Sequence, residues 1–400
     1  MPSQIEPVSR LLGVLLNPQS GPASHSQIET VGETLHAPGF LMHCRENGIA
    51  PLVYRGLEET GLTTQLPASV HGAFKRAYYR TLADNLERFS DLREIARVCA
   101  DRQIDSVVLK GPALIQLLYS DPGLRPMDDL DLLVHPTDLP AFKQGLQGLG
   151  FQPVPLYPNL LTRGKTIVDL HTDPINRSRI AARGAAISLN LDALWEQTQP
   201  LPTFWPLRTL DLADQLITLA IHALKHGFRQ TIWQVDLAAC CERVTAQNRW
   251  PDVRLKATAS RAPRVLSLAF YAVYRDLGAP FSPQTRCILA TFPPPGWEKN
   301  LLELAKDPGL LHFLEPLVLF KTLEQPQAGV RLLLEMAFPR PEIMHQIMGR
   351  EGPIPLWWAY FYRFFQLALM GLKCLAMAIR YGLSKKPSAL SPARGGEHPP

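Results

Sequence analysis

The sequence has few of the features that mark secreted scaffolds, zinc modules or nucleic-acid-binding domains. Its six cysteines among 400 residues show no C-x-x-C spacing and too low a density for a disulfide scaffold. Charged residues make up only 19%, and the Lys and Arg residues behind the net charge of +5 are scattered. We therefore expect a reducing, cytoplasmic compartment and no dedicated nucleic-acid surface.

Long uncharged apolar runs are also missing. The most apolar segment, "LWWAYFYRFFQLALMGLKCLAMAIRYGL" (356–383), is interrupted by Arg363, Lys373 and Arg380. No stretch within it reaches the roughly 20 uncharged residues that a spanning helix needs. The pattern favours a long amphipathic helix packed on the body of the protein, with membrane contact through 356–383 as the less favoured alternative. The N-terminus, with Glu6 before a short apolar stretch, is a poor secretory signal.

What is present is an ordinary globular composition with 46% hydrophobic residues and 37 prolines. Such a chain can bury a large core, divided by length into two or three packed units. The periodicity of apolar residues predicts five regions along the chain. These are a helical N-terminal region (1–102), an α/β core (103–190), a helical C-terminal region (191–350), an apolar amphipathic helix (351–383) and a disordered tail (384–400).

Within the α/β core, short apolar runs at 105–109, 129–134 and 165–173 predict three strands. Side chains alternate between the two faces of a strand, so Asp129 and Asp131 share one face of "DLDLLV". The same alternation pairs Asp169 with His171 in "TIVDLHTD". If the two strands are neighbours, three carboxylates converge on one face of the sheet.

Three converging carboxylates repel one another unless a cation lies among them. Hard oxygen ligands of this kind suit Mg²⁺, and two Mg²⁺ ions on one acidic cluster can stabilise both oxygens of a phosphoryl displacement. On this basis we predict a Mg²⁺ site formed by Asp129, Asp131 and Asp169. Asp131→Asn should then relieve repulsion and leave the fold unharmed or slightly stabilised.

The segment "LKGPALIQLLY" before the second strand predicts a strand, a turn and a helix that begins at or just after Pro112. Gly111 would let backbone amides approach an anion at the helix N-terminus. Lys110 and Arg125 are the nearby cations that could neutralise a triphosphate. For Arg125, a salt bridge that only holds the turn is an equally good explanation.

The order of these motifs resembles the nucleotidyltransferase superfamily. More narrowly, "LKGPALIQLLYSDPGLRPMDDLDLLV" followed by "IVDLH" resembles an uncharacterised bacterial nucleotidyltransferase family with the pattern L-K-G, R-x-x-G-D-[IL]-D-L-L-V and D-L-H. The match covers residues 107–173 closely. Two positions depart from the pattern: Pro112 replaces a serine of the superfamily, and Asp128 replaces the usual glycine of the family.

The resemblance implies an α+β fold, with a small nucleotidyltransferase-like mixed β-sheet unit and flanking helices embedded between helical N- and C-terminal regions. It also implies a Mg²⁺-dependent enzyme that transfers a nucleoside monophosphate from a nucleoside triphosphate to an unknown acceptor, a small molecule or a protein. Asp129, Asp131 and Asp169 would be the catalytic metal ligands. The segment "HALKH" is less specific: His222 and His226 have zinc-like spacing but lack the glutamate of H-E-x-x-H.

His171, His222, His226 and Asp236 are candidates for lining a substrate cleft, and His171 is equally a candidate ligand, orienting group or base. A non-catalytic nucleotide- or partner-binding protein on the same fold is the alternative from another class. A D-x-D glycosyltransferase is less favoured, because the segment before the D-x-D is mostly helical. An aspartyl phosphatase is also disfavoured, because its D-x-D follows an apolar strand and this one opens a strand.

Overall fold

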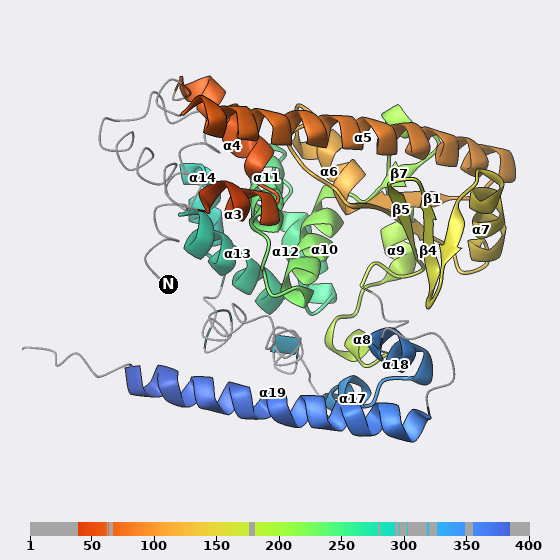
Figure 1. The fold of residues 1–400 in the computed structure, drawn as a ribbon, viewed down its shortest axis with the longest axis vertical. Helices are drawn as coiled ribbons and strands as arrows, with labels where there is room; N and C mark the ends of the chain where they lie inside the picture. The colour runs from red at the N-terminus through yellow and green to blue at the C-terminus, as the bar shows by residue number, and fades with distance from the viewer. Residues whose placement is uncertain are drawn as a thin grey trace, which may run out of the picture.

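The computed structural model describes residues 39–61, 67–175, 181–278, 281–292, 326–348 and 355–384, with a few isolated positions between them. The expected helical start of the chain and the expected tail lie outside the described residues. In the described part, helices flank one mixed sheet (Figure 1). The expected α+β fold class is confirmed.

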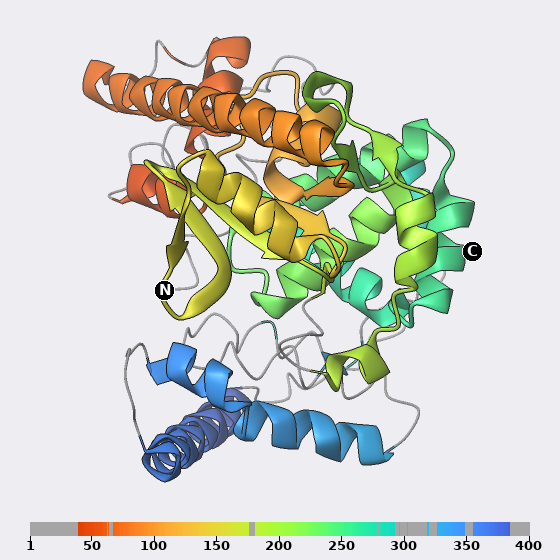
Figure 2. The same ribbon diagram turned by 90° about the vertical axis from the view of Figure 1, so that its right-hand side faces the viewer.

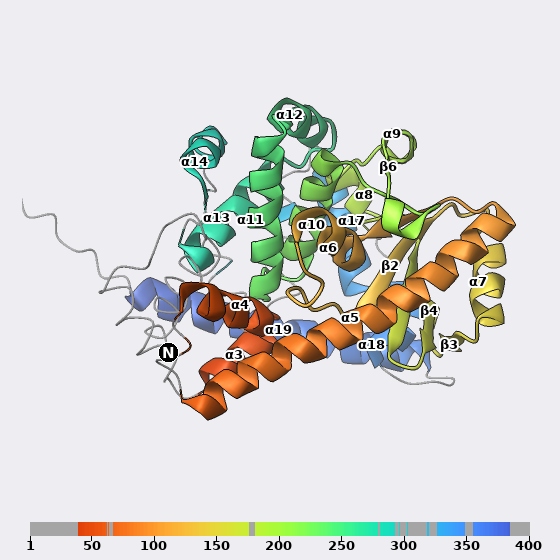
Figure 3. The same cartoon turned by 90° about the horizontal axis from the view of Figure 1, so that it is seen from above.

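In the described part of the chain, three α-helices precede the sheet. They are α3 (Phe40–Glu46), α4 (Ala50–Thr60) and α5 (Ala68–Arg102). The 35-residue α5 ends where Gln103 adopts the left-handed conformation with φ of 55°. Seen from above, α5 crosses from α3 and α4 to the sheet (Figure 3). This helix therefore connects the N-terminal helices to the strands that carry the predicted site.

The sheet has seven strands among the described residues, in the order β3-β4-β5-β2-β1-β7-β6. Their bounds are β1 (Ser106–Leu109), β2 (Asp129–Val134), β3 (Gln152–Val154), β4 (Tyr157–Arg163), β5 (Thr166–His171), β6 (Gln199–Pro200) and β7 (Arg208–Thr209). The central strand β2 is antiparallel to β1 and parallel to β5. The two acid-bearing strands are therefore direct neighbours.

Short helices connect the strands. They are α6 (Lys110–Leu118), α7 (Leu139–Gly148), α8 (Arg183–Ala186), α9 (Leu191–Glu196) and the 3₁₀ helix η3 (Pro202–Phe204). One face of the sheet is apolar: Leu130, Leu132 and Val134 of β2 and Val168 and Leu170 of β5 pack in a core with residues of α5 and α7. Since side chains alternate, the acidic residues of both strands point to the opposite face.

The helical region after the sheet forms a second core. Its helices are α10 (Leu212–Lys225), α11 (Thr231–Ala246), α12 (Trp250–Ala259), α13 (Pro263–Leu277) and α14 (Pro283–Leu289). The side chain of Asp211 caps α10 by accepting a hydrogen bond from the amide of Asp214 at 2.8 Å. Residues of α10, α11 and α13 join residues of α3 and α4 in one large apolar cluster. This cluster fixes α10 and α11 beside the sheet.

Three further helices lie at the edge of the molecule that is remote from α5 (Figures 1 and 2). They are α17 (Pro326–Ala337), α18 (Pro341–Met348) and α19 (Leu356–Ser384). The hydroxyl of Tyr360 on α19 donates to the carbonyl of Pro339, at 2.7 Å, between α17 and α18. Among the residues that the structure describes, no helix combines the length and the apolar character needed to cross a bilayer.

Two parts of the sheet were not predicted from the sequence. The hairpin of β3 and β4 follows α7, and the strands β6 and β7 lie beyond residue 190, where only helices were expected. Strands of two residues leave no periodicity to read, and β7 is fixed by pairing with β1 rather than by its own pattern. The sheet therefore extends past the predicted end of the α/β core.

Candidate active site

Two neighbouring strands bring acidic side chains together on the face of the sheet opposite the apolar core. In the register of β2 and β5, Asp131 is aligned with Asp169, and Leu133 is aligned with His171. Ligand atoms of Asp131, Asp169 and His171 all lie within 4.8 Å of one another. This group of two carboxylates and one imidazole could hold a metal ion.

Asp131 is hydrogen-bonded to two other side chains of the site. Its Oδ1 accepts hydrogen bonds from Lys110 Nζ and from His171 Nε2, both at 2.7 Å. Burial opposes ionisation of Asp131, but Lys110 and His171 outweigh it and hold the pKa of this carboxyl well below its usual range. Burial and the charge of Lys110 lower the pKa of His171, but the hydrogen bond and charge of Asp131, with the charge of Asp169, outweigh them and raise it. Asp131 is therefore ionised, paired with Lys110 and hydrogen-bonded to His171.

Asp169 and Asp129 differ from Asp131 in that their pKa values are raised. His171 Nε2 lies 3.3 Å from Asp169 Oδ2, yet burial and the charge of Asp131 still raise the pKa of Asp169. Burial, the charge of Asp131 and, less strongly, that of Asp169 raise the pKa of Asp129 to about 6. Asp129 shares the face of Asp131 but is outside the group of ligand atoms within 4.8 Å. These two carboxylates therefore provide the uncompensated negative charge.

The raised pKa of Asp129 gives a pH-dependent prediction. A carboxyl whose folded-state pKa is above its unfolded value stabilises the fold at low pH, and this stability is lost as pH rises through the folded pKa. The window lies between the unfolded-state pKa of 3.8 and the folded-state pKa of about 6, so Asp129→Asn should match the metal-free parent near pH 3.5 and exceed its unfolding free energy by about 1–2 kcal/mol near pH 7.5. Urea titrations at the two pH values measure the difference. The control is Asp128→Asn, which changes an exposed neighbour and should shift stability little; a pH-independent effect of Asp129→Asn would contradict the prediction.

The turn before α6 differs from expectation in one respect. The helix begins at Lys110, two residues before Pro112, and Lys110 takes a left-handed φ of 48°. Gly111 is tightly enclosed: an added Cβ would lie 3.0 Å from Met127 Cβ and 3.2 Å from an Arg125 nitrogen. A larger residue at 111 would therefore disturb this packing, whatever it did to phosphate binding.

Arg125 is held in a buried ion pair. Its Nη2 donates to Asp236 Oδ2 at 2.9 Å, its Nη1 donates to the carbonyl of Pro126, and Tyr119 donates its hydroxyl to Asp236 Oδ1 at 2.6 Å. Asp236 is on α11, 111 residues along the chain from Arg125. These contacts favour the explanation that Arg125 and Asp236 hold the turn against α11, and both side chains are buried.

His222 and His226, at the end of α10, form a cluster of rings with Trp233 of α11. The ring centroids of His222 and His226 are 4.7 Å apart, and each lies 5.2 Å from that of Trp233. Burial lowers the pKa of both histidines, that of His226 to about 4, and the charge of Lys110 adds to the effect. They are therefore neutral near pH 7. Among the described residues, the group of ligand atoms that could hold a metal ion does not include them.

Lys225 lies between these two histidines and was not singled out from the sequence. It is half-buried, and its charge acts on the carboxyl of Asp169 by lowering the pKa that burial raises. The "HALKH" motif contained this signal, because a lysine three residues after His222 lies on the same side of a helix as that histidine. Lys225 joins Lys110 as a cation close to the acidic group.

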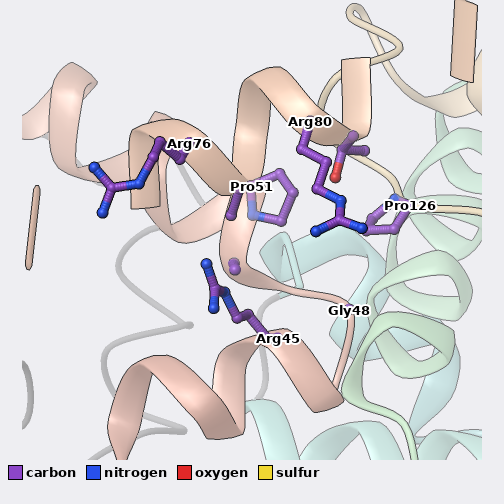
Figure 4. Close-up of a pocket in the computed structure, with 9 residues that line it drawn as sticks. Arg45, Gly48, Pro51, Arg76, Arg80 and Pro126 are labelled. Atoms are coloured by element: carbon purple, nitrogen blue, oxygen red, sulfur yellow. The ribbon is translucent and has the colours of Figure 1, made fainter. Parts of the chain in front are cut away.

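A separate pocket lies between α3, α4 and α5 (Figure 4). Its volume is about 620 Å³, and three arginines, Arg45, Arg76 and Arg80, contribute to its lining together with Pro51 and Pro126. Apart from Pro126, which precedes β2 in the chain, the lining residues belong to the N-terminal helical part. The pocket is thus a basic feature distinct from the acidic group on β2 and β5.

The group of Asp131, Asp169 and His171, with Lys110 at the start of α6 bonded to it, fits a metal-dependent nucleotidyltransferase. Comparison with protein families supports this class: the model of the family described as "Uncharacterised nucleotidyltransferase" matches residues 34–275. The chain belongs to this family, which confirms the resemblance seen in its motifs. Neither the curated proteins nor the solved structures gave a match.

Proposed function

We propose that the protein transfers a nucleoside monophosphate from a nucleoside triphosphate to an acceptor, in a Mg²⁺-dependent reaction that releases pyrophosphate. The acceptor is a small molecule or a protein, and the reaction takes place in the cytoplasm. The observation that carries the proposal is the grouping of Asp131, Asp169 and His171 within 4.8 Å in a chain of this family.

The donor set fits a hard divalent cation. Asp129, Asp131 and Asp169 offer carboxylate oxygens on one face of the sheet, and their uncompensated charge is reflected in the raised pKa values of Asp129 and Asp169. Two Mg²⁺ ions bound there would neutralise phosphate charge and stabilise the attacking and leaving oxygens. His171 orients Asp131 through their 2.7 Å contact.

The other residues of the site would bind and orient the triphosphate. Lys110 Nζ reaches the acidic group from the first residue of α6, so it can balance phosphate charge beside the amides of Gly111 and the helix N-terminus. Lys225 adds a second cation, while the neutral His222 and His226 would line the substrate cleft. In this arrangement Arg125 and Asp236 brace the turn and do not contact the phosphates.

The proposed step is an in-line displacement. An acceptor hydroxyl oxygen forms a bond to the α-phosphorus while the bond from that phosphorus to the oxygen bridging the α- and β-phosphates breaks. The proton of the hydroxyl passes to Asp169, whose raised pKa and partly exposed carboxylate suit a general base. Pyrophosphate leaves with the electron pair of the broken bond.

The test is a label-transfer experiment with the purified full chain, Mg²⁺ and a host lysate as the source of acceptors. Nucleoside triphosphates labelled at the α-phosphate should give a labelled acceptor, whereas γ-labelled ones should release labelled pyrophosphate only. Chelation of Mg²⁺ should abolish both signals. Mg²⁺-dependent nucleotide binding without any transfer would instead support the non-catalytic alternative.

A further inference from the structure

The outward face of α19 is unusually apolar for a protein surface. Of the side chains on Leu356–Leu369, only that of Ala359 is buried. The exposed fractions are 71% for Trp357, 58% for Phe361, 62% for Phe364 and 63% for Leu372. Sequence analysis favoured a helix packed on the protein body, but this exposure shows that the apolar side of α19 faces away from it.

These exposed residues follow one face of the helix. Positions 357, 361, 364, 368 and 372 recur at intervals of three and four, and all five are exposed. Arg363 and Gln366, on the opposite side, are only half-exposed. The stripe spans the 16 residues 357–372, or about 22 Å at a rise of 1.5 Å between successive residues. Contiguous apolar patches of this extent mark interaction surfaces.

The charge of α19 is of one sign. Between Leu356 and Ser384 the sequence has no Asp or Glu but contains Arg363, Lys373 and Arg380, and Lys385 and Lys386 follow directly. Two copies of such a helix would repel each other, which argues against a dimer through this face. An acid-free helix with Trp, Tyr and Phe on one side and Lys or Arg beside them is typical of helices that lie on anionic membranes.

We propose that α19 docks the protein on an anionic lipid bilayer, with the helix axis in the plane of the surface. Trp357, Phe361 and Phe364 would enter the region between headgroups and acyl chains, and Lys373 would contact anionic headgroups. The charges that interrupt the helix keep it from spanning, in agreement with the hydropathy of the described helices. The neighbouring α17 also exposes the apolar side chains of Val330, Leu333 and Leu334, and Phe338 just after it is exposed as well.

The location of α19 is separate from that of the candidate active site. Figures 1 and 2 show α19 at the molecular edge remote from α5, with α17 and α18 in the same part of the structure. The carboxylates lie on β2 and β5, in a different part of the fold. Docking through α19 is therefore independent of the transfer chemistry, and each proposal can fail without the other.

The experiment is sedimentation of the full chain with vesicles of phosphatidylcholine alone or of phosphatidylcholine mixed with phosphatidylglycerol. The parent protein should bind the anionic vesicles at least about tenfold more strongly than the neutral ones, and high salt should reduce the difference. Lys373→Glu should weaken binding to the anionic vesicles only. Equal binding to both kinds of vesicle, or no binding, would overturn the proposal.

Two variants test whether vesicle binding depends on the apolar stripe of α19 or on any exposed apolar side chain. Trp357→Ser combined with Phe364→Ser should lower vesicle binding at least about tenfold, because both side chains leave water on docking. Leu255→Ser on α12, where Leu255 is 73% exposed, should leave binding unchanged. If the parent is a dimer by light scattering and the double variant is a monomer that retains vesicle binding, the stripe joins two copies and the proposal is wrong.

Discussion

Replacing Asp169 by Asn is expected to lower nucleotidyl transfer at least about 100-fold while leaving the metal-free fold intact. The carboxylate of Asp169 belongs to the group that could hold a metal ion, and it is the proposed acceptor of the hydroxyl proton. Its raised pKa shows that the ionised form is disfavoured in the metal-free protein, so neutral Asn costs little there. The substitution therefore removes function and spares stability.

Two measurements check this prediction. The first is the rate of label transfer from an α-labelled nucleoside triphosphate. The second is the thermal stabilisation by Mg²⁺ with a non-hydrolysable nucleotide, which needs no acceptor and should disappear in Asp169→Asn. Asp128→Asn, an adjacent exposed carboxylate, is the matched control and should retain both signals. Parental stabilisation by Mg²⁺ and nucleotide in Asp169→Asn would remove Asp169 from the metal site.

Asp131→Asn, in contrast to Asp169→Asn, should destabilise the fold and lower the unfolding free energy by about 2–4 kcal/mol. Asp131 is 3% exposed, and its Oδ1 accepts from both Lys110 and His171. Removal of its charge takes away the carboxylate that both groups hydrogen-bond at 2.7 Å and leaves Asp169, 3.3 Å from His171, as the next carboxylate. This result would differ from the sequence-based prediction that the substitution is neutral or slightly stabilising, which did not include these two hydrogen bonds.

Urea denaturation of Asp131→Asn at two pH values tests the contact between Asp131 and His171. His171 has a raised pKa in the folded state, so its contact with Asp131 contributes fully below its ordinary pKa of 6.5 and is lost as pH rises through the folded value. The loss caused by Asp131→Asn should thus be larger at pH 6 than at pH 8. The double variant with Lys110→Met should lose less than the sum of the single variants. An Asp131→Asn protein as stable as the parent at pH 6 would contradict the assigned ion pairs.

Local rules identified much of the site in the sequence. Alternation along a strand placed Asp129 with Asp131 and Asp169 with His171, while the neighbouring position of the two strands was a condition of the predicted site. The observed register aligns Asp131 with Asp169. The rule works here because each strand buries its other face, with Leu130, Leu132 and Val168 in the core, so a one-residue slip would bury the carboxylates.

The sequence by itself determined the family, the strands that carry the carboxylates and the amphipathic pattern of α19. Only the tertiary structure decided which charged groups pair. Asp236 forms an ion pair with Arg125, which lies 111 residues away in the chain. Lys110 and His171 donate hydrogen bonds to Asp131, whereas Asp129 keeps a raised pKa. It also decided that the apolar face of α19 points outward. The physical reason is that periodicity defines which residues share a face, whereas pairing and burial depend on what other parts of the chain bring to that face.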